Sequence, residues 1–83
     1  MYNVKERLDQ TMFNGAYTYN VNERVITLPL TEGKHKGRVI HIKEDEDFYY
    51  KVFILNEKGE KIYKKKVKKV ESIVNYIWRK FLA

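Results

Sequence analysis

Near the N-terminus the apolar residues have the spacing of a helix. Three of them recur at every fourth position: Val4, Leu8 and Met12. This spacing places them on one stripe of a short helix. Asn3 followed by Glu6 has the pattern of a capping box, so we expect the helix to begin there and to end at Asn14-Gly15.

From residue 16 the apolar period becomes two, which is the spacing of β-strands. Two strands joined at Asn22-Glu23 would each put three apolar residues on one face: Tyr17, Tyr19 and Val21 on the first, and Ile26, Leu28 and Leu30 on the second. Pro29 has no backbone N–H to donate, so we expect the second strand to lie at an edge or to fray there. Residues 31–37 are polar, with a glycine on each side of Lys34-His35-Lys36, and predict a loop.

The middle of the chain predicts a third strand over residues 38–43 and a fourth over residues 48–55, separated by the acidic run 44–47. In the segment 56–60 the glycine at position 59 suits the left-handed position of a three-residue hairpin loop. That turn predicts a fifth strand and a register with three opposed pairs: Ile54 with Ile62, Phe53 with Tyr63, and Lys51 with Lys65.

The last segment predicts a helix over about residues 68–82. Its apolar residues follow the 3.6-residue period: Val67, Val70, Ile73, Val74, Ile77, Trp78, Phe81 and Leu82. We expect this stripe to pack across the sheet with Trp78 buried, so that Trp78→Ala would cost about 3–5 kcal/mol.

These elements predict an α+β fold: an antiparallel sheet of about five short strands, with a short N-terminal helix and a C-terminal amphipathic helix packed on it. The alternative is a small SH3-like or Sm-like barrel with terminal helices. The 83 residues are enough for one hydrophobic core, and we expect a single domain over residues 1–83.

Composition indicates where the protein is found and what kind of genome encodes it. Cysteine is absent and no run approaches 18 apolar residues, so we expect a cytoplasmic protein without disulfides or a membrane span. Phe, Tyr, Met, Ile, Asn and Lys supply 39 of the 83 residues, a bias that AT-rich coding DNA produces. This bias suggests a phage or mobile-element origin.

Residues for catalysis and metal binding are sparse. Ser72 is the only serine, there is no cysteine, and neither common glycine-rich phosphate loop occurs. His35 and His41 without cysteine do not have the spacing of a zinc site, and the acidic run 44–47 lacks the EF-hand pattern, so we expect it to be a solvated turn. We therefore expect no enzyme activity, no cofactor and no metal.

Positive charge is concentrated in the last third of the chain. Residues 58–83 carry nine basic and two acidic residues, net +7, whereas residues 1–57 carry eight basic and nine acidic ones. The strand pattern predicts that Phe48, Tyr50, Val52, Ile54 and Ile62 face the helix while aromatic and basic residues share the opposite face of the last hairpin. The candidate site comprises Lys51, Lys61, Lys64, Lys65, Lys66, Lys68 and Lys69, to hold phosphates, and Tyr49, Phe53 and Tyr63, to stack on bases.

The sequence favours a small non-enzymatic nucleic-acid-binding protein, with the type of nucleic acid left open. The alternative function is an adaptor or inhibitor that docks on an acidic protein surface. In a third interpretation the aromatic face is a second core surface and the lysines only reach past it to water. Edge pairing would permit a dimer but nothing in the sequence requires one.

Overall fold

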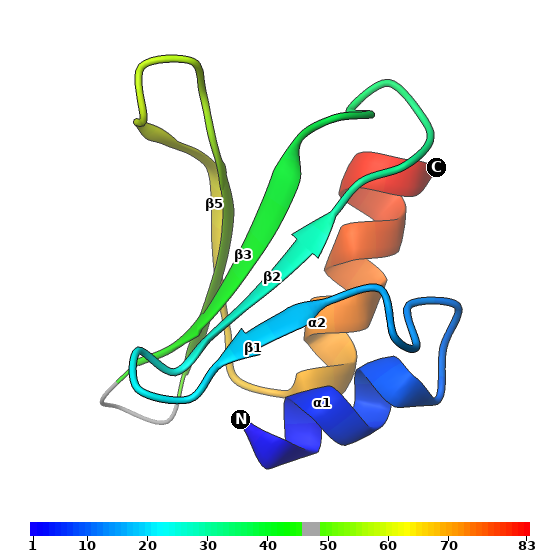
Figure 1. Cartoon of the computed structure of the whole chain (residues 1–83), viewed down its shortest axis with the longest axis vertical. Coiled ribbons are helices and arrows are strands. Elements are labelled where there is room, and N and C mark those ends of the chain that lie inside the picture. Colours follow the sequence, from blue (N-terminus) through cyan, green and yellow to red (C-terminus); the bar gives the residue numbers. More distant parts are fainter. Residues whose placement is uncertain (46–48) are drawn as a thin grey trace.

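The structure, a computed structural model that describes residues 1–45 and 49–83, is built on an open antiparallel sheet. Its five strands follow one another in chain order: β1 (Thr18–Asn20), β2 (Val25–Pro29), β3 (Val39–Glu44), β4 (Tyr50–Leu55) and β5 (Lys61–Val67). β1 and β5 lie at opposite edges and do not pair with each other (Figure 1). The expected α+β fold is therefore confirmed in its open-sheet form, and the barrel alternative is wrong.

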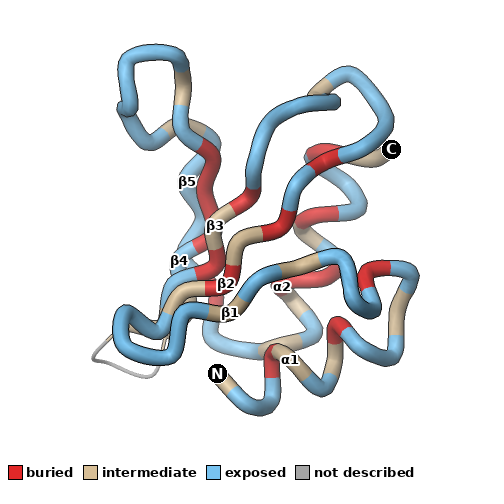
Figure 2. The backbone as a smooth tube through the Cα atoms, viewed as in Figure 1, coloured by how far each residue is buried: buried red, intermediate tan, exposed pale blue. Residues whose placement is uncertain are grey.

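Two helices cover the same face of this sheet (Figure 1). They are α1 (Tyr2–Asp9) and α2 (Val70–Ile77), and α2 continues as a π-helical turn, η1 (Trp78–Leu82). Buried residues gather on the inner face of the sheet and on the helix sides that face it (Figure 2). No helix in the described part of the chain is long and apolar enough to cross a membrane.

The N-terminal helix differs from its prediction at both ends. It begins at Tyr2 without a side-chain cap, so the capping box of Asn3 and Glu6 does not form. It ends at Asp9, where tight turns begin, and Met12 is consequently 55% exposed while Phe13 enters the core in its place. The predicted burial is confirmed for Val4 and Leu8 and wrong for Met12, because the helix ends before it reaches Met12.

The first two strands follow their predicted period where they pair. Ile26, Leu28 and Leu30 are buried as expected. Val21 is exposed because β1 ends at Asn20 and the chain turns there. β2 lies between β1 and β3, so the expectation of an edge strand is wrong for the strand as a whole. β1 pairs only as far as Thr27, which leaves Pro29 paired with Val39 of β3 alone, and the pairing with β3 continues through Pro29 without fraying.

The C-terminal helix starts two residues later than expected, because the extended Lys69 is its N-cap. Ile73, Ile77 and Phe81 are almost fully buried, whereas Trp78 is 44% exposed. Each residue of a helix turns the side chain by about 100°, which carries Trp78 from the centre of the stripe at Ile77 to its margin. The expectation that Trp78 is a core residue is therefore wrong, and Phe81 is the large buried aromatic of this helix.

We predict that Phe81→Ala lowers the free energy of unfolding by about 3–5 kcal/mol, because it leaves a cavity between helix and sheet. Trp78→Ala, which empties a half-exposed position, should cost less than half as much. Urea unfolding followed by circular dichroism compares the two. Equal losses would contradict the packing of Phe81 described above.

Candidate polyanion-binding site

The hairpin that joins β4 and β5 closes as its sequence predicts. The Asn56 N–H donates to the Glu60 carbonyl at 2.9 Å, and Gly59 has a φ of 80°. The Asn56 side-chain oxygen accepts the N–H groups of Lys58 and Glu60, both at 2.9 Å. The predicted pairing of Ile54 with Ile62 is confirmed.

Further along the hairpin a β-bulge changes the register. Val52 opposes Lys65, two residues before Ile54, which opposes Ile62, so β5 holds one extra residue between these pairs. Tyr63, inside the bulge, has a φ of 52°, a left-handed conformation that costs a non-glycine residue about 1 kcal/mol or more. The predicted pairings of Phe53 with Tyr63 and of Lys51 with Lys65 are therefore wrong.

The bulge moves side chains of β5 to faces that simple alternation does not give. Lys65 lies opposite the buried Val52 and so belongs to the helix side of the sheet, while Lys66 lies opposite Lys51 on the outer side. Tyr63 also lies on the helix side, with its ring centroid 6.1 Å from that of Phe81. The expectation that Tyr63 and Lys65 share the outer face is wrong because an inserted residue reverses the alternation.

A row of lysines crosses the outer face at this register. Lys43, Lys51 and Lys66 are direct cross-strand neighbours on β3, β4 and β5. Adjacent strands lie about 4.8 Å apart, so the like charges destabilise the sheet. Asp45 offsets part of this cost, with carboxylate contacts of 3.6 Å to Lys51 and 3.9 Å to Lys66.

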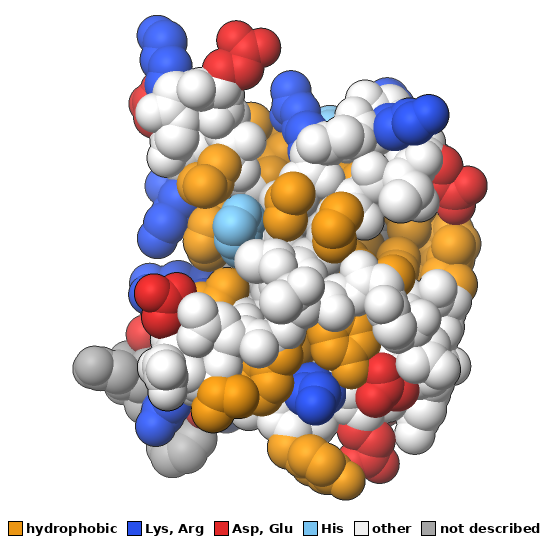
Figure 3. All heavy atoms as spheres, viewed as in Figure 1, with side chains coloured by type: hydrophobic (Ala, Val, Ile, Leu, Met, Phe, Trp, Pro, Cys, Tyr) orange, Lys and Arg blue, Asp and Glu red, His pale blue; other side chains and the backbone are white. Residues whose placement is uncertain are grey.

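The outer face is basic beyond this row. A hollow of about 390 Å³ is lined by Lys51, Val52, Phe53, Lys61, Lys64, Lys65 and Lys66. Blue Lys and Arg side chains accumulate along the β5 edge of the molecule (Figure 3). Apart from Val52, every described residue in the lining of this hollow belongs to the site predicted from the sequence.

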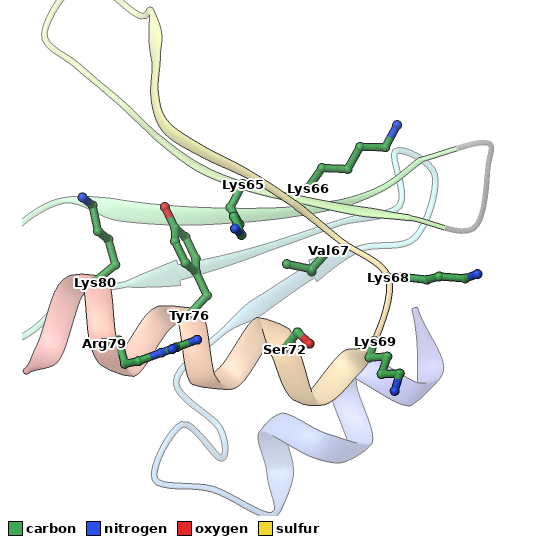
Figure 4. A pocket seen from close by; sticks show the side chains of 9 residues that line it. All are labelled: Lys65, Lys66, Val67, Lys68, Lys69, Ser72, Tyr76, Arg79 and Lys80. Atoms are coloured by element: carbon green, nitrogen blue, oxygen red, sulfur yellow. The ribbon is translucent and has the colours of Figure 1, made fainter.

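A second and larger hollow lies on the helix side of β5. This groove, of about 660 Å³, runs between the strand and the C-terminal helix and is lined by Lys65, Lys66, Val67, Lys68, Lys69, Ser72, Tyr76, Arg79 and Lys80 (Figure 4). Six of these nine residues are basic and none is acidic. We call this feature the β5–α2 groove.

The helix wall of the groove was missed by sequence reasoning. Four residues form this wall, at spacings of four, three and one: Ser72, Tyr76, Arg79 and Lys80. This spacing places them on one helix face beside the apolar stripe. The two-residue link from β5 to α2 also indicates that this face lies near the lysine strand. Arg79 Nε donates to the Asn75 carbonyl at 3.4 Å, which holds the base of the guanidinium against its own helix.

Two of the predicted stacking residues already carry partners on the outer face. Phe53 is only 7% exposed, with the His41 ring stacked on it at 5.2 Å and the Lys61 ammonium 4.8 Å from its centroid. A base has no access to this ring, so Phe53 is not a stacking surface. Tyr49 is partly buried and has the Lys66 ammonium 4.6 Å from its ring centroid.

Tyr63 is held in its strained conformation by contacts on the helix side. The Tyr76 hydroxyl donates to the Tyr63 carbonyl at 2.9 Å, and the Lys80 ammonium lies 4.7 Å from the Tyr63 ring centroid. The rings of His35 and Phe81 make edge contacts with Tyr63 at 5.4 and 6.1 Å. The bulge, the loop 31–37 and the end of the C-terminal helix are thus joined at one end of the groove.

The acidic run is partly structural. The Met1 ammonium donates a hydrogen bond to Glu44 Oε2 at 2.7 Å, and this ion pair connects the start of α1 to the end of β3. Asp45 faces the lysine row, so neither residue is the purely solvated turn that was expected. Glu46, Asp47 and Phe48 lie outside the described residues, as does the expectation that Phe48 faces the helix.

Both histidines are biased toward their neutral form. Burial lowers the pKa of His41, and the neighbouring Lys61 lowers it further. Burial also lowers the pKa of His35, assisted by the positive charges of Arg38, Lys34 and Lys80. A group whose pKa falls on folding favours the unfolded state when it is protonated.

We predict that both histidines titrate below about 6.5 by NMR. Folding stability should therefore decline as the pH drops from that value through the pKa of the folded state. Lys61→Gln should move the His41 midpoint upward and leave that of His35 unchanged, because Lys61 acts only on His41. Equal shifts in the titration midpoints of both histidines, or no shift in either, would contradict the effect of the Lys61 charge on His41.

Comparison with known proteins gives no relative for this chain. No protein-family model, no curated protein and no solved structure matches it. No residue role is therefore transferred from another protein.

Proposed function

We propose that this protein binds nucleic acid in the cytoplasm through the basic edge formed by β5 and the two hollows beside it, without catalysing a reaction. One observation carries the proposal: six basic residues line the β5–α2 groove, and no acidic residue occurs among the described residues of its lining. A surface of one charge sign attracts a polyanion and concentrates it near the surface. Phosphate contacts of this kind supply most of the affinity in non-specific nucleic-acid binding.

The charge arrangement has a cost that folding alone does not explain. Lys43, Lys51 and Lys66 oppose one another across three strands, and Lys68 and Lys69 precede a helix N-terminus, where positive charge is unfavourable. Edge strands often carry lysine to prevent aggregation, which accounts for part of β5. It does not account for basic residues on the facing helix wall, and an anionic ligand removes the repulsion at all of these positions.

The phosphate-binding set now includes residues from three parts of the chain. It comprises Lys51, Lys61, Lys64, Lys65, Lys66, Lys68, Lys69, Arg79 and Lys80. Lysine predominates, and lysine acts as a point charge, whereas reading of guanine depends chiefly on the arginine fork. We therefore expect binding with little sequence preference.

A second candidate function has its own structural support. Among the described strands β5 pairs only with β4, so its outer edge is open to an added strand. A partner that contributes an acidic strand would gain backbone hydrogen bonds and meet the lysines of this edge. Such an adaptor or inhibitor would show no affinity for random oligonucleotides, which separates it from the first proposal.

We predict that replacing Lys64, Lys65 and Lys66 together by glutamine weakens nucleic-acid binding and flattens its salt dependence. Loss of three contacts should reduce the log–log slope by about 2–3, at 0.7–0.9 per contact. Fluorescence anisotropy titrations from about 50 to 200 mM salt measure both quantities. The fold should persist, because exposed substitutions usually change stability by less than about 0.5 kcal/mol each.

The matched control replaces Lys34, Lys36 and Lys58 by glutamine. These three exposed lysines lie outside the lining of both hollows, and their loss lowers the net charge by the same amount. The control should bind almost as the parent does. Equal effects of the two triple variants would show that only net charge matters, and no binding by the parent at about 50 mM salt would overturn the proposal.

A further inference from the structure

We infer that the β5–α2 groove is the path of a single-stranded nucleic acid, and that duplex is the poorer ligand. This inference rests on the proposed function and assigns it a substrate class. Three features of the structure support it: the placement of charge on both walls, the aromatic ring between them, and the charge of the protruding hairpin.

One basic residue on each wall of the groove points toward the opposite wall. Lys65 extends from β5 toward the helix, and Lys80 extends from the helix toward the strand (Figure 4). Charges on facing walls surround a single backbone on both sides, whereas the two backbones of a duplex are held apart by its grooves and cannot both enter one narrow hollow. A basic groove that tracks one backbone is the arrangement typical of single-strand binders.

The ring of Tyr76 lies between these walls. It is the only aromatic residue among the described residues of the groove lining, and it is partly buried. Its orientation is set by the hydrogen bond to the Tyr63 carbonyl at 2.9 Å and by the edge contact with Phe81 at 5.8 Å. A ring fixed in this way loses little freedom when a base stacks on it, and such stacking accepts every base.

The part of the molecule that protrudes most is poorly suited to duplex. A two-stranded ribbon such as β4–β5 fits the major groove of DNA in principle. Its turn carries Glu57 and Glu60 as well as Lys58, and both carboxylates would face the dense negative charge of the duplex. Among the described residues, all the charged side chains that line the groove on the helix side of this ribbon are positive.

The length of the groove sets the expected site size. Lys69 and Lys80 are eleven residues apart along the helix, which at 1.5 Å per residue is about 16 Å. At about 3.4 Å per nucleotide this distance spans about five stacked nucleotides. Affinity should therefore rise with oligonucleotide length up to about five nucleotides and change much less beyond it.

The test compares labelled 12-nucleotide single strands of mixed sequence with the matching 12-base-pair duplex, at about 50 mM salt. We expect the single strand to bind at least about tenfold more tightly. The double variant Arg79→Gln/Lys80→Gln should weaken single-strand binding and reduce its salt slope by about 1.4, at 0.7 per contact. Lys34→Gln/Lys36→Gln, which removes the same charge from a loop outside the groove lining, is the matched control and should leave that slope unchanged.

The contribution of Tyr76 separates stacking from charge. Tyr76→Leu should weaken single-strand binding by about fivefold to a hundredfold without changing the salt slope, because stacking releases no counterions. Tyr76→Phe keeps the ring and should restore most of the affinity. Circular dichroism and urea unfolding verify that both variants fold. If Tyr76→Leu does not fold, the Arg79→Gln/Lys80→Gln variant alone tests the groove.

The outcomes distinguish this inference from the function on which it rests. If the protein binds neither oligonucleotide, nucleic-acid binding itself fails. If duplex binds as tightly as single strand, or if the Arg79/Lys80 variant behaves as its control does, nucleic-acid binding stands and the single-strand groove is wrong. Equal affinity of the Tyr76→Phe and folded Tyr76→Leu variants would remove stacking from the mechanism.

Discussion

The whole architecture depends on one helix covering the inner face of an open sheet. Because the strands do not close into a barrel, the apolar inner face would otherwise be exposed, and Ile73, Ile77 and Phe81 bury it. Only Lys68 and Lys69 separate the last strand from this helix, so the helix must return alongside β5. The basic residues of the strand and of the helix are thereby brought to the two sides of one groove, and the packing that stabilises the core also creates the surface proposed to bind.

The charge on that surface is best understood as a balance between folding and binding. Each opposed lysine pair destabilises the sheet by a fraction of a kcal/mol, and Asp45 offsets only part of that repulsion. Lys61 and Lys66 place their ammonium groups over aromatic rings, so cation–π attraction recovers some of the cost on the outer face. This supports the interpretation that the outer aromatics are mainly structural. Of the basic residues that line the groove, Lys66 and Lys80 also have ring contacts. The remaining four have no such contact among the described residues and are the stronger evidence for binding: Lys65, Lys68, Lys69 and Arg79.

The sequence predicted the order and type of the elements because their apolar periods were long and regular. It predicted less well wherever one residue altered the period. The bulge at Tyr63 reversed the faces of the following residues, and an early helix end exchanged Met12 for Phe13 in the core. Trp78 was misplaced because a broad apolar stripe does not show which of its members lies at the margin. For the site, the lysines of β5 were evident as a run, whereas Arg79 and Lys80 became relevant only when the helix was placed against the strand.

The bulge also explains how three consecutive lysines serve two surfaces. In a regular strand Lys65 would share the outer face with Lys51, and Lys64 and Lys66 would lie on the helix side. With the extra residue at Tyr63, Lys65 lies on the helix side of the sheet and Lys66 on the outer side, and both contribute to the groove and to the outer hollow, whereas Lys64 lines the outer hollow. The left-handed conformation of Tyr63 is the local cost of this arrangement, and the Tyr76 hydrogen bond and the Lys80 contact hold it. Strain of this kind often persists at functional sites, and here it connects the edge strand to the same helix face that forms the opposite wall of the groove.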